Sequence, residues 1–328
     1  MSTVTTPIPS HATELRLGVP QVHGGITIVP LLAAALSQRT YITLDEAMPH
    51  GFTVEEIDLH GHVPELLVRN PLTTDVLLYD GEEVVGAKQN RVLEASILVA
   101  ASTTQKIPVA CVEAGRWHDS GAAFAPADRV AHPESRRRKA SDLEHAPLAH
   151  GVAQSTVWAE IDERLDASAV HSPTSALSDV HEAERPRIDE LSDAFELVGG
   201  QCGAILALGD RLCLDLVSRP EAWTQLWPKL RRGYLLDGIR HVNDEPTASE
   251  LIARFADGVE SAPSTSRPSP GLGEDVRLHG TTVSGSCLVV DGETIQLSAY
   301  SRDDRGGHVG LGGLSDTSRI ARPSRRHR

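Results

Sequence analysis

Residues 75–87, DVLLYDGEEVVGA, carry the clearest local structural signal in the chain. Two apolar runs are joined by Asp80-Gly81, a dipeptide common in tight turns because both residues tolerate a positive φ. The pattern predicts an antiparallel β-hairpin. We expect its second strand to continue to residue 91, with an apolar centre buried on both faces and a polar end where the strand emerges.

Apolar, β-branched runs flank this hairpin at short and regular spacing, at residues 24–33, 41–48, 63–70, 94–100 and 106–113. Strands of this length and spacing favour a sandwich or a barrel over a parallel α/β sheet. Residues 20–118 are therefore expected to form a β-rich half.

The pattern changes after residue 118. Residues 119–150 are small, polar and charged, which predicts a long loop or mobile insertion, and the RRRK run within it is expected to be solvated. Apolar spacing then predicts helices and hairpins: helices at 155–165, 187–198 and 219–240, and hairpins at 202–218 and 286–300. This order predicts an α+β fold, with a sandwich- or barrel-like first half and a mixed α/β second half.

These elements divide the chain into five expected segments. They are a flexible N-terminus at 1–19, the β-rich half at 20–118, a polar loop at 119–152, the mixed α/β half of the same domain at 153–300, and a disordered arginine-rich tail at 301–328. The last ten residues contain five arginines and no acidic residue. A solvated tail is the plain interpretation, and a tail that binds phosphate or acidic groups is the alternative.

The composition indicates a soluble cytoplasmic protein. A formal net charge of −14 argues against a protein that coats nucleic acid. The N-terminal stretch lacks the apolar core of a secretory signal, and no apolar run is long enough to span a membrane. The four cysteines have no CxxC spacing and lie in apolar runs, which predicts reduced and mostly buried thiols.

Two polar blocks contain side chains suited to a ligand. The first, GAKQNR, ends in Lys88, Gln89, Asn90 and Arg91. Lysine and arginine can hold a phosphate or carboxylate, and the two amides can bind a base edge or a sugar. The alternative is a strand end that is polar only because it reaches solvent.

The second block, CVEAGRWH at 111–118, follows an apolar strand. Glu113 is a candidate general base if burial raises its pKa. It can equally be the ion-pair partner of Arg116, and Arg116 with Trp117 can be a packing feature.

Other common chemistries lack their motifs. The closest histidine pair is HGH at 60–62, and no HExxH or Cys/His spacing is present, so we expect no metal. No glycine-rich dinucleotide or phosphate loop and no GxSxG is present, so we expect no bound cofactor and no hydrolase serine.

Three blocks together resemble a bacterial domain family. They are residues 81–117 (GEEVVGAKQNR through CVEAGRW), 200–239 (GQCGAILALGD through RRGYLLDGI) and 289–300 (VVDGETIQLSAY). They are similar to the ARPP domain, the ARG and Rhodanese-Phosphatase-superfamily Associated Protein family, over roughly residues 20–300. The family is named for its association with ADP-ribosylglycohydrolases and rhodanese-type phosphatases. The resemblance therefore implies a role near ADP-ribose or phosphorylated nucleotides, without establishing a reaction.

Two hypotheses follow from the resemblance and the blocks. In the first, the protein binds and processes an ADP-ribose-like or phosphorylated nucleotide. Phosphates would contact Lys88, Arg91 and Arg116, the ribose or base would contact Gln89 and Asn90 beside Trp117, and the general base would be Glu113 or Glu82.

The second hypothesis is a non-catalytic binding or assembly module that partners those glycohydrolase or phosphatase enzymes. Its contact surface would be an apolar stripe at Trp223, Trp227 and Tyr234, provided that the stripe is exposed. The residues leave open whether the protein is an enzyme.

Overall fold

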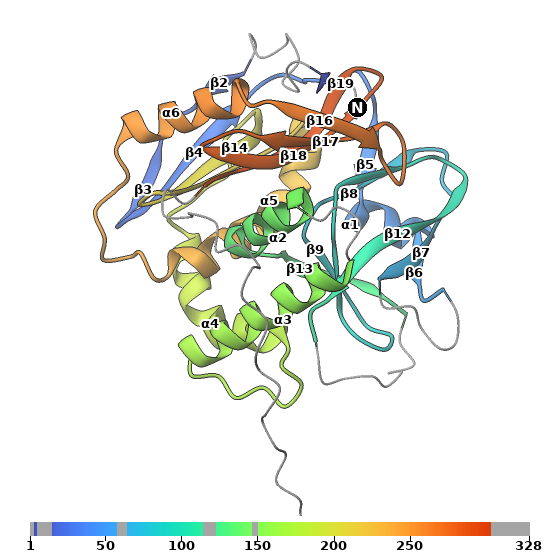
Figure 1. Cartoon of the computed structure of the whole chain (residues 1–328), viewed down its shortest axis with the longest axis horizontal. Helices are drawn as coiled ribbons and strands as arrows, with labels where there is room; N and C mark the ends of the chain where they lie inside the picture. The colour runs from blue at the N-terminus through green and yellow to red at the C-terminus, as the bar shows by residue number, and fades with distance from the viewer. Residues whose placement is uncertain (1–2, 5–14, 58–63, 114–122, 146–149, 303–328) are drawn as a thin grey trace, which may run out of the picture.

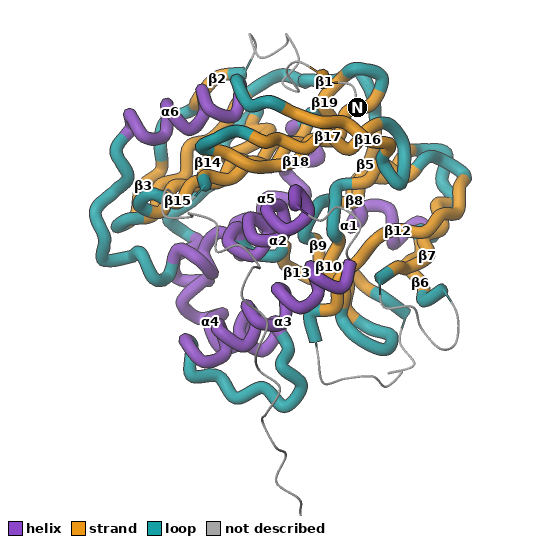
Figure 2. The backbone as a smooth tube through the Cα atoms, viewed as in Figure 1, coloured by secondary structure: helices purple, strands orange, loops and turns teal. Residues whose placement is uncertain are grey.

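The computed structural model describes residues 3–4, 15–57, 64–113, 123–145 and 150–302. These residues form an α+β fold with three β-sheets, as the sequence predicts (Figure 1). Figure 2 shows one broad sheet, a second group of strands beside it, and helices packed below the broad sheet. None of the helices in the described segments combines the length and apolar character needed to cross a membrane.

The first half of the chain contains a half-barrel. Its strands are β5 (Tyr41–Thr43), β6 (Thr53–Glu55), β7 (Glu65–Asn70), β8 (Asp75–Leu78), β9 (Glu82–Val85), β10 (Arg91–Leu93), β11 (Ile97–Val99), β12 (Thr103–Cys111) and β13 (Ala125–Val130). They pair as a six-stranded sheet in the order β13-β9-β10-β12-β7-β6 and a three-stranded sheet in the order β11-β8-β5. The predicted barrel-like first half is thus confirmed.

The turn at Asp80-Gly81 forms, but the predicted hairpin is wrong. The Glu82 amide donates to the Tyr79 carbonyl at 3.0 Å, and Gly81 has φ +85°. Strand β8 pairs with β11 and β5, whereas β9 pairs with β10 and β13. Only Gly81 of the two turn residues has a positive φ, so the turn lacks the twist-matched geometry that keeps two hairpin strands together.

The second half is built on a large sheet. Its strands are β1 (Thr3–Val4), β2 (Arg16–Leu17), β3 (Gln21–His23), β4 (Ile26–Leu32), β14 (Gln201–Leu208), β15 (Arg211–Val217), β16 (Ser264–Pro268), β17 (Glu274–His279), β18 (Val283–Val290) and β19 (Glu293–Ser301). The order is β1-β16-β17-β18-β19-β15-β14-β4-β2, with β3 also on β4. Both hairpins predicted in this half, β14–β15 and β18–β19, are confirmed. Every strand pair in this sheet is antiparallel, so the sheet is not mixed.

The helices of the described residues are α1 (Leu44–Ala47), the short 3-10 helix η2 (Met48–His50), α2 (Pro133–His145), α3 (His150–Ala167), α4 (Leu177–Ser192), α5 (Pro220–Gly238) and α6 (Ser249–Glu260). Helix α1 packs with the half-barrel, whereas α5 and α6 cover opposite faces of the large sheet. Successive side chains of β14 point to opposite faces. Leu206 and Leu208 therefore join the core that contains α5, and Ile205 and Ala207 join the core that contains Phe255 of α6.

The predicted loop at 119–150 is wrong over its described part, which contains β13 and α2. The RRRK run lies on α2, and two of its members are buried, with Arg136 at 1% exposure and Lys139 at 7%. Arg136 pairs with Asp215 and Lys139 pairs with Asp80. Both acidic partners are distant in sequence, so the local composition could not show that these charges are neutralised inside the fold.

Other predicted boundaries also shift. The strand expected at 41–48 ends at Thr43, and α1 begins at the next residue, Leu44. The helix expected at 187–198 begins at Leu177 and ends at Ser192. Strand β2, within the N-terminal segment expected to be flexible, pairs with β4. The HGH pair and residues 303–328 of the predicted tail lie outside the described residues.

Candidate functional site: a cavity lined by arginines

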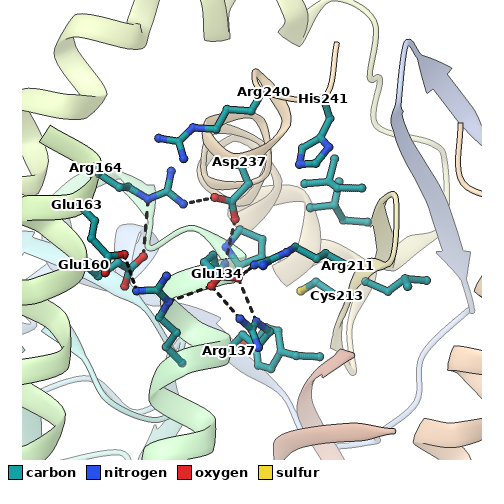
Figure 3. A pocket seen from close by; sticks show the side chains of 16 residues that line it. Glu134, Arg137, Glu160, Glu163, Arg164, Arg211, Cys213, Asp237, Arg240 and His241 are labelled. Atoms are coloured by element: carbon teal, nitrogen blue, oxygen red, sulfur yellow. Dashed lines mark hydrogen bonds and ion pairs between the residues drawn. The ribbon is translucent and has the colours of Figure 1, made fainter. Parts of the chain in front are cut away.

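A cavity of about 260 Å³ lies between the large sheet and the helices on one of its faces. Residues of α2, α3 and the end of α5 form its walls. Its floor is mostly apolar and comes from β14, β15 and β19, through Leu206, Leu208, Leu212, Cys213 and Tyr300. Figure 3 shows charged side chains from several elements gathered around this space.

Glu134, in the first turn of α2, holds three arginines around the cavity. Its carboxylate accepts hydrogen bonds from Arg137 at 2.8 and 3.0 Å and from Arg138 at 2.9 Å. Arg211, the first residue of β15, reaches the same carboxylate from the sheet. Burial alone would raise the pKa of Glu134, but the arginines hold that pKa well below its usual range. The carboxylate is therefore ionised at neutral pH.

A second set of ion pairs lies on the other side of the cavity. Arg164 of α3 donates a hydrogen bond to the Asp237 carboxylate of α5, and the Arg164 Nε lies 3.7 Å from Glu160 Oε1. Glu160 in turn lies 2.5 Å from Nε2 of the buried His132. Asp237 also accepts the Glu134 backbone amide at 2.9 Å, so the two sets of charges are connected. This network fixes most of the charged wall before any ligand binds.

Arg240 differs from the other four arginines of the cavity. It is exposed and makes no hydrogen bond or ion pair with the described residues, and no dashed line reaches it in Figure 3. The cavity is lined by five arginines and four carboxylates, so its lining carries one net positive charge with His241 neutral. That unbalanced charge is assigned to Arg240.

The segment that carries Arg240 is fixed to the turn between β3 and β4. The Gly25 amide donates to the His241 carbonyl at 2.9 Å. Gly24 has φ +55°, and a Cβ at this position would lie 1.9 Å from the Val242 carbonyl oxygen. Nδ1 of His241 lies 2.8 Å from the Asp244 carboxylate, which orients the ring. The close approach of glycine backbone therefore holds this edge of the cavity in place.

The family model of the ARG and Rhodanese-Phosphatase-superfamily-associated Protein domain, ARPP-1, matches residues 14–300. The chain belongs to the ARPP-1 family. No curated protein and no solved structure matches it. The match confirms the resemblance inferred from the three sequence blocks and spans both halves of the fold. The cavity lies within the matched residues.

In this ARPP-1 domain the predicted polar block 86–91 is a turn, so the expected continuous strand is wrong. Strand β9 ends at Val85, and β10 begins at Arg91 and runs back beside it. Gly86 has φ +132° and Ala87 has φ +42°, which reverses the chain. Period-two alternation therefore does not extend through this block.

The structure brings the described parts of the two polar blocks together. Gln89 Nε2 donates to the Glu113 carbonyl at 2.8 Å, and the Asn90 amide lies 3.4 Å from the Glu113 carboxylate. Arg91 is fully buried, donates to Gln89 Oε1 at 3.1 Å and lies 3.7 Å from Glu56. Lys88 is half-buried in the turn. Arg116 and Trp117 lie outside the described residues.

Glu82, the other predicted catalytic residue, is fully buried. Its carboxylate accepts hydrogen bonds from the Tyr79 backbone amide at 2.8 Å and from the Lys229 ammonium at 3.1 Å. Burial raises the pKa of Glu82, and Lys229 acts in the opposite direction. None of the predicted site residues that the structure describes lines the arginine cavity. Their ligand and catalytic roles stay a prediction.

The apolar stripe of α5 is buried. Trp223 and Tyr234 are 0% exposed and Trp227 is 3% exposed. The two tryptophan rings pack with centroids 5.9 Å apart. The stripe therefore cannot supply the contact surface on which the assembly-module hypothesis depended.

One sequence signal could have indicated the cavity. Glu134 precedes Arg137 and Arg138 by three and four residues, the spacing at which opposite charges pair on a helix. That spacing predicts a helix in a stretch that composition alone assigns to a loop. Arg211 and Arg240 have no comparable local signal, because only the fold places them beside this helix.

Proposed function

We propose that this ARPP-1 domain binds an ADP-ribose-like or phosphorylated nucleotide, or a phosphorylated part of one, in the arginine-lined cavity. The observation that carries the proposal is Arg240, a cavity-lining cation that has no acidic partner among the described residues. Its unbalanced charge makes the cavity suited to an anion rather than to a neutral ligand.

The chemistry of the lining supports a phosphate. Arginine presents a planar set of N–H donors that matches the oxygens of phosphate, and it stays charged at every physiological pH. Arg211 is 47% exposed, so its guanidinium can contact a ligand at little cost in desolvation. The apolar floor then offers a surface for the sugar or base attached to that phosphate.

The family supports the class of ligand. Its name associates the domain with ADP-ribosylglycohydrolases and rhodanese-type phosphatases, whose chemistry concerns ADP-ribosyl groups and phosphate esters. We propose that the domain works beside such enzymes and takes a ligand from the same pool. The alternative of a non-catalytic assembly module has lost its predicted contact surface, since the α5 stripe is buried.

The test is calorimetric titration with AMP, ribose 5-phosphate and ADP-ribose. Binding by the wild type is expected to weaken about tenfold or more in Arg240→Ala and in Arg211→Ala, because each removes a charge-assisted contact. Arg185→Ala is the matched control, since Arg185 is a half-exposed arginine that does not line the cavity. A bound ligand at about 100 times its Kd should also stabilise the fold by about 2.7 kcal/mol.

The same titration locates the site. Loss of binding in Lys88→Ala, with Arg211→Ala and Arg240→Ala unaffected, would place the ligand at the polar block predicted from sequence. Absence of binding with all three compounds, from folded wild-type protein, would reject the proposed function.

A further inference from the structure

We infer, on the basis of the proposed function, that the cavity selects a terminal phosphate monoester on a sugar over the internal diphosphate of ADP-ribose or NAD. The ligand class is thus a phosphoribosyl end, as in AMP or ribose 5-phosphate. The inference rests on the size of the cavity and on the way in which its charges are already paired.

The size of the cavity limits the ligand to an end group. Sites for drug-sized ligands usually measure about 300–1,000 Å³. This cavity measures about 260 Å³, so it holds one phosphate with its sugar rather than two nucleosides joined by a diphosphate. An internal diphosphate carries a bulky group on each side, so only part of such a ligand would lie within this volume.

The existing ion pairs determine how much negative charge a ligand needs in order to bind. Glu134 already occupies three of the five arginines, and Asp237 occupies a fourth. A ligand must therefore compete with the Glu134 carboxylate for Arg211 while it also binds Arg240. A phosphate monoester carries roughly −1.5 to −2 charges at pH 7, whereas each phosphate of a diester or internal diphosphate carries one. The monoester therefore carries the most charge on a single phosphate group, which favours it over the alternatives in displacing Glu134 from Arg211.

The positions of the two available arginines favour the same group. Arg211 comes from the sheet at the start of β15, and Arg240 comes from the segment after α5. A monoester has three terminal oxygens and can accept from guanidinium groups on two sides at once. A diester, or a phosphate within an internal diphosphate, has only two unsubstituted oxygens and so offers fewer acceptors to the two arginines.

The experiment compares AMP with 3′,5′-cyclic AMP, which has the same base and sugar but a singly charged diester, by calorimetry on the full chain at one ionic strength. ADP-ribose and NAD are titrated in parallel, and ribose 5-phosphate is compared with ribose. We expect AMP and ribose 5-phosphate to bind at least about tenfold more tightly than cyclic AMP, ADP-ribose and NAD.

Glu134→Gln tests the competition directly. Without the internal carboxylate, cyclic AMP should gain more affinity than AMP, and the preference for the monoester should shrink. Circular dichroism checks that this variant is folded, and the wild-type comparison decides the inference if it is not. Equal or tighter binding of ADP-ribose or cyclic AMP by the wild type would overturn the inference while leaving the proposed function intact. No binding by any of these compounds overturns both.

Discussion

Arg136 and Asp215 form a buried, two-point ion pair that joins helix α2 to strand β15. The guanidinium donates to both carboxylate oxygens, at 2.8 and 2.7 Å, and the side chains are 1% and 0% exposed. The carboxylate also accepts the hydroxyls of Tyr79, Tyr234 and Ser298, at 2.7, 2.7 and 2.6 Å. One carboxylate therefore connects the first half of the chain, α5 and β19 behind the floor of the cavity.

Removing one partner of this pair should be strongly destabilising. Arg136→Met leaves Asp215 charged and buried without its cation, so the free energy of unfolding should fall by about 3–5 kcal/mol. Urea denaturation measures this change. Arg185→Ala removes a half-exposed ion pair with Glu182 and should cost less than about 1 kcal/mol. Similar losses in both variants would contradict the central role of the buried pair.

The same pair makes the fold sensitive to acid. Burial alone would raise the pKa of Asp215, but Arg136 and the hydroxyl hydrogen bonds lower the pKa to about 2. A carboxyl whose pKa is lower in the folded state stabilises the fold above its unfolded pKa near 4, and this stability is lost as pH falls toward 2. The loss should amount to about 2 kcal/mol. Denaturation between pH 5 and pH 2 should show it in the wild type, and the contribution should be absent from Asp215→Asn.

Removing the hydroxyl group should lower the stability of the fold at Tyr234 but not at Tyr300. Tyr234 donates to Asp215 at 2.7 Å, so Tyr234→Phe should cost roughly 1.5–3 kcal/mol, the range for a hydrogen bond to a charged group. The buried Tyr300 hydroxyl has no hydrogen-bond partner among the described residues. Tyr300→Phe should therefore leave stability unchanged or raise it. Thermal unfolding of both variants checks the difference, and equal destabilisation would show that the Tyr300 hydroxyl has an internal partner.

Gly81 should tolerate a methyl group less well than Gly209. Both glycines have a positive φ, at +85° and +62°, so alanine costs backbone strain of about 1–2 kcal/mol at either position. A Cβ at Gly81 would also lie 2.6 Å from Cδ of Arg136, whereas nothing lies within 4 Å at Gly209. Gly81→Ala should therefore be the more destabilising variant in urea denaturation. Equal costs would mean that Arg136 moves aside freely.

The thiols should be unreactive in the folded protein. All four cysteines are buried, and burial raises the pKa of Cys111 to about 11 and the pKa values of Cys202 and Cys287 to about 12. The reactive thiolate is therefore scarce at pH 8. Titration with a disulfide reagent should detect the thiols only in denaturant. Rapid reaction of any of these thiols in the native protein would contradict this expectation.

Sequence patterns correctly predicted the elements that are defined by residues close together in the chain. The β14–β15 and β18–β19 hairpins, strand β4 and helix α5 follow from alternation, apolar spacing and turn residues. The Asp80-Gly81 hairpin was wrong although its turn forms, because pairing depends on which strands offer a better partner. Strand β8 pairs with β11 and β5, and β9 pairs with β10 and β13.

The candidate cavity could not be predicted from the sequence, because its lining residues come from distant parts of the chain. Arg211 and Arg240 stand far from α2 in the chain, and only the tertiary fold brings them to Glu134 and its helix. The block around Lys88 was predicted from its polarity and from the family resemblance. Within it, the Gln89 side chain is hydrogen-bonded to the Glu113 carbonyl, so this polar group is satisfied inside the protein.

The sequence by itself determined the fold class, the family and most of the strands, because alternation and turn chemistry depend on neighbouring residues and the family match compares residues along the chain. Tertiary structure alone decided that Arg136 and Lys139 are core residues rather than solvated charges. A charge can be buried only where an opposite charge meets it, and Asp215 and Asp80 come from other parts of the chain. The position of each ion-pair partner is a property of the whole fold, and this property leaves Arg240 at the cavity without an acidic partner among the described residues.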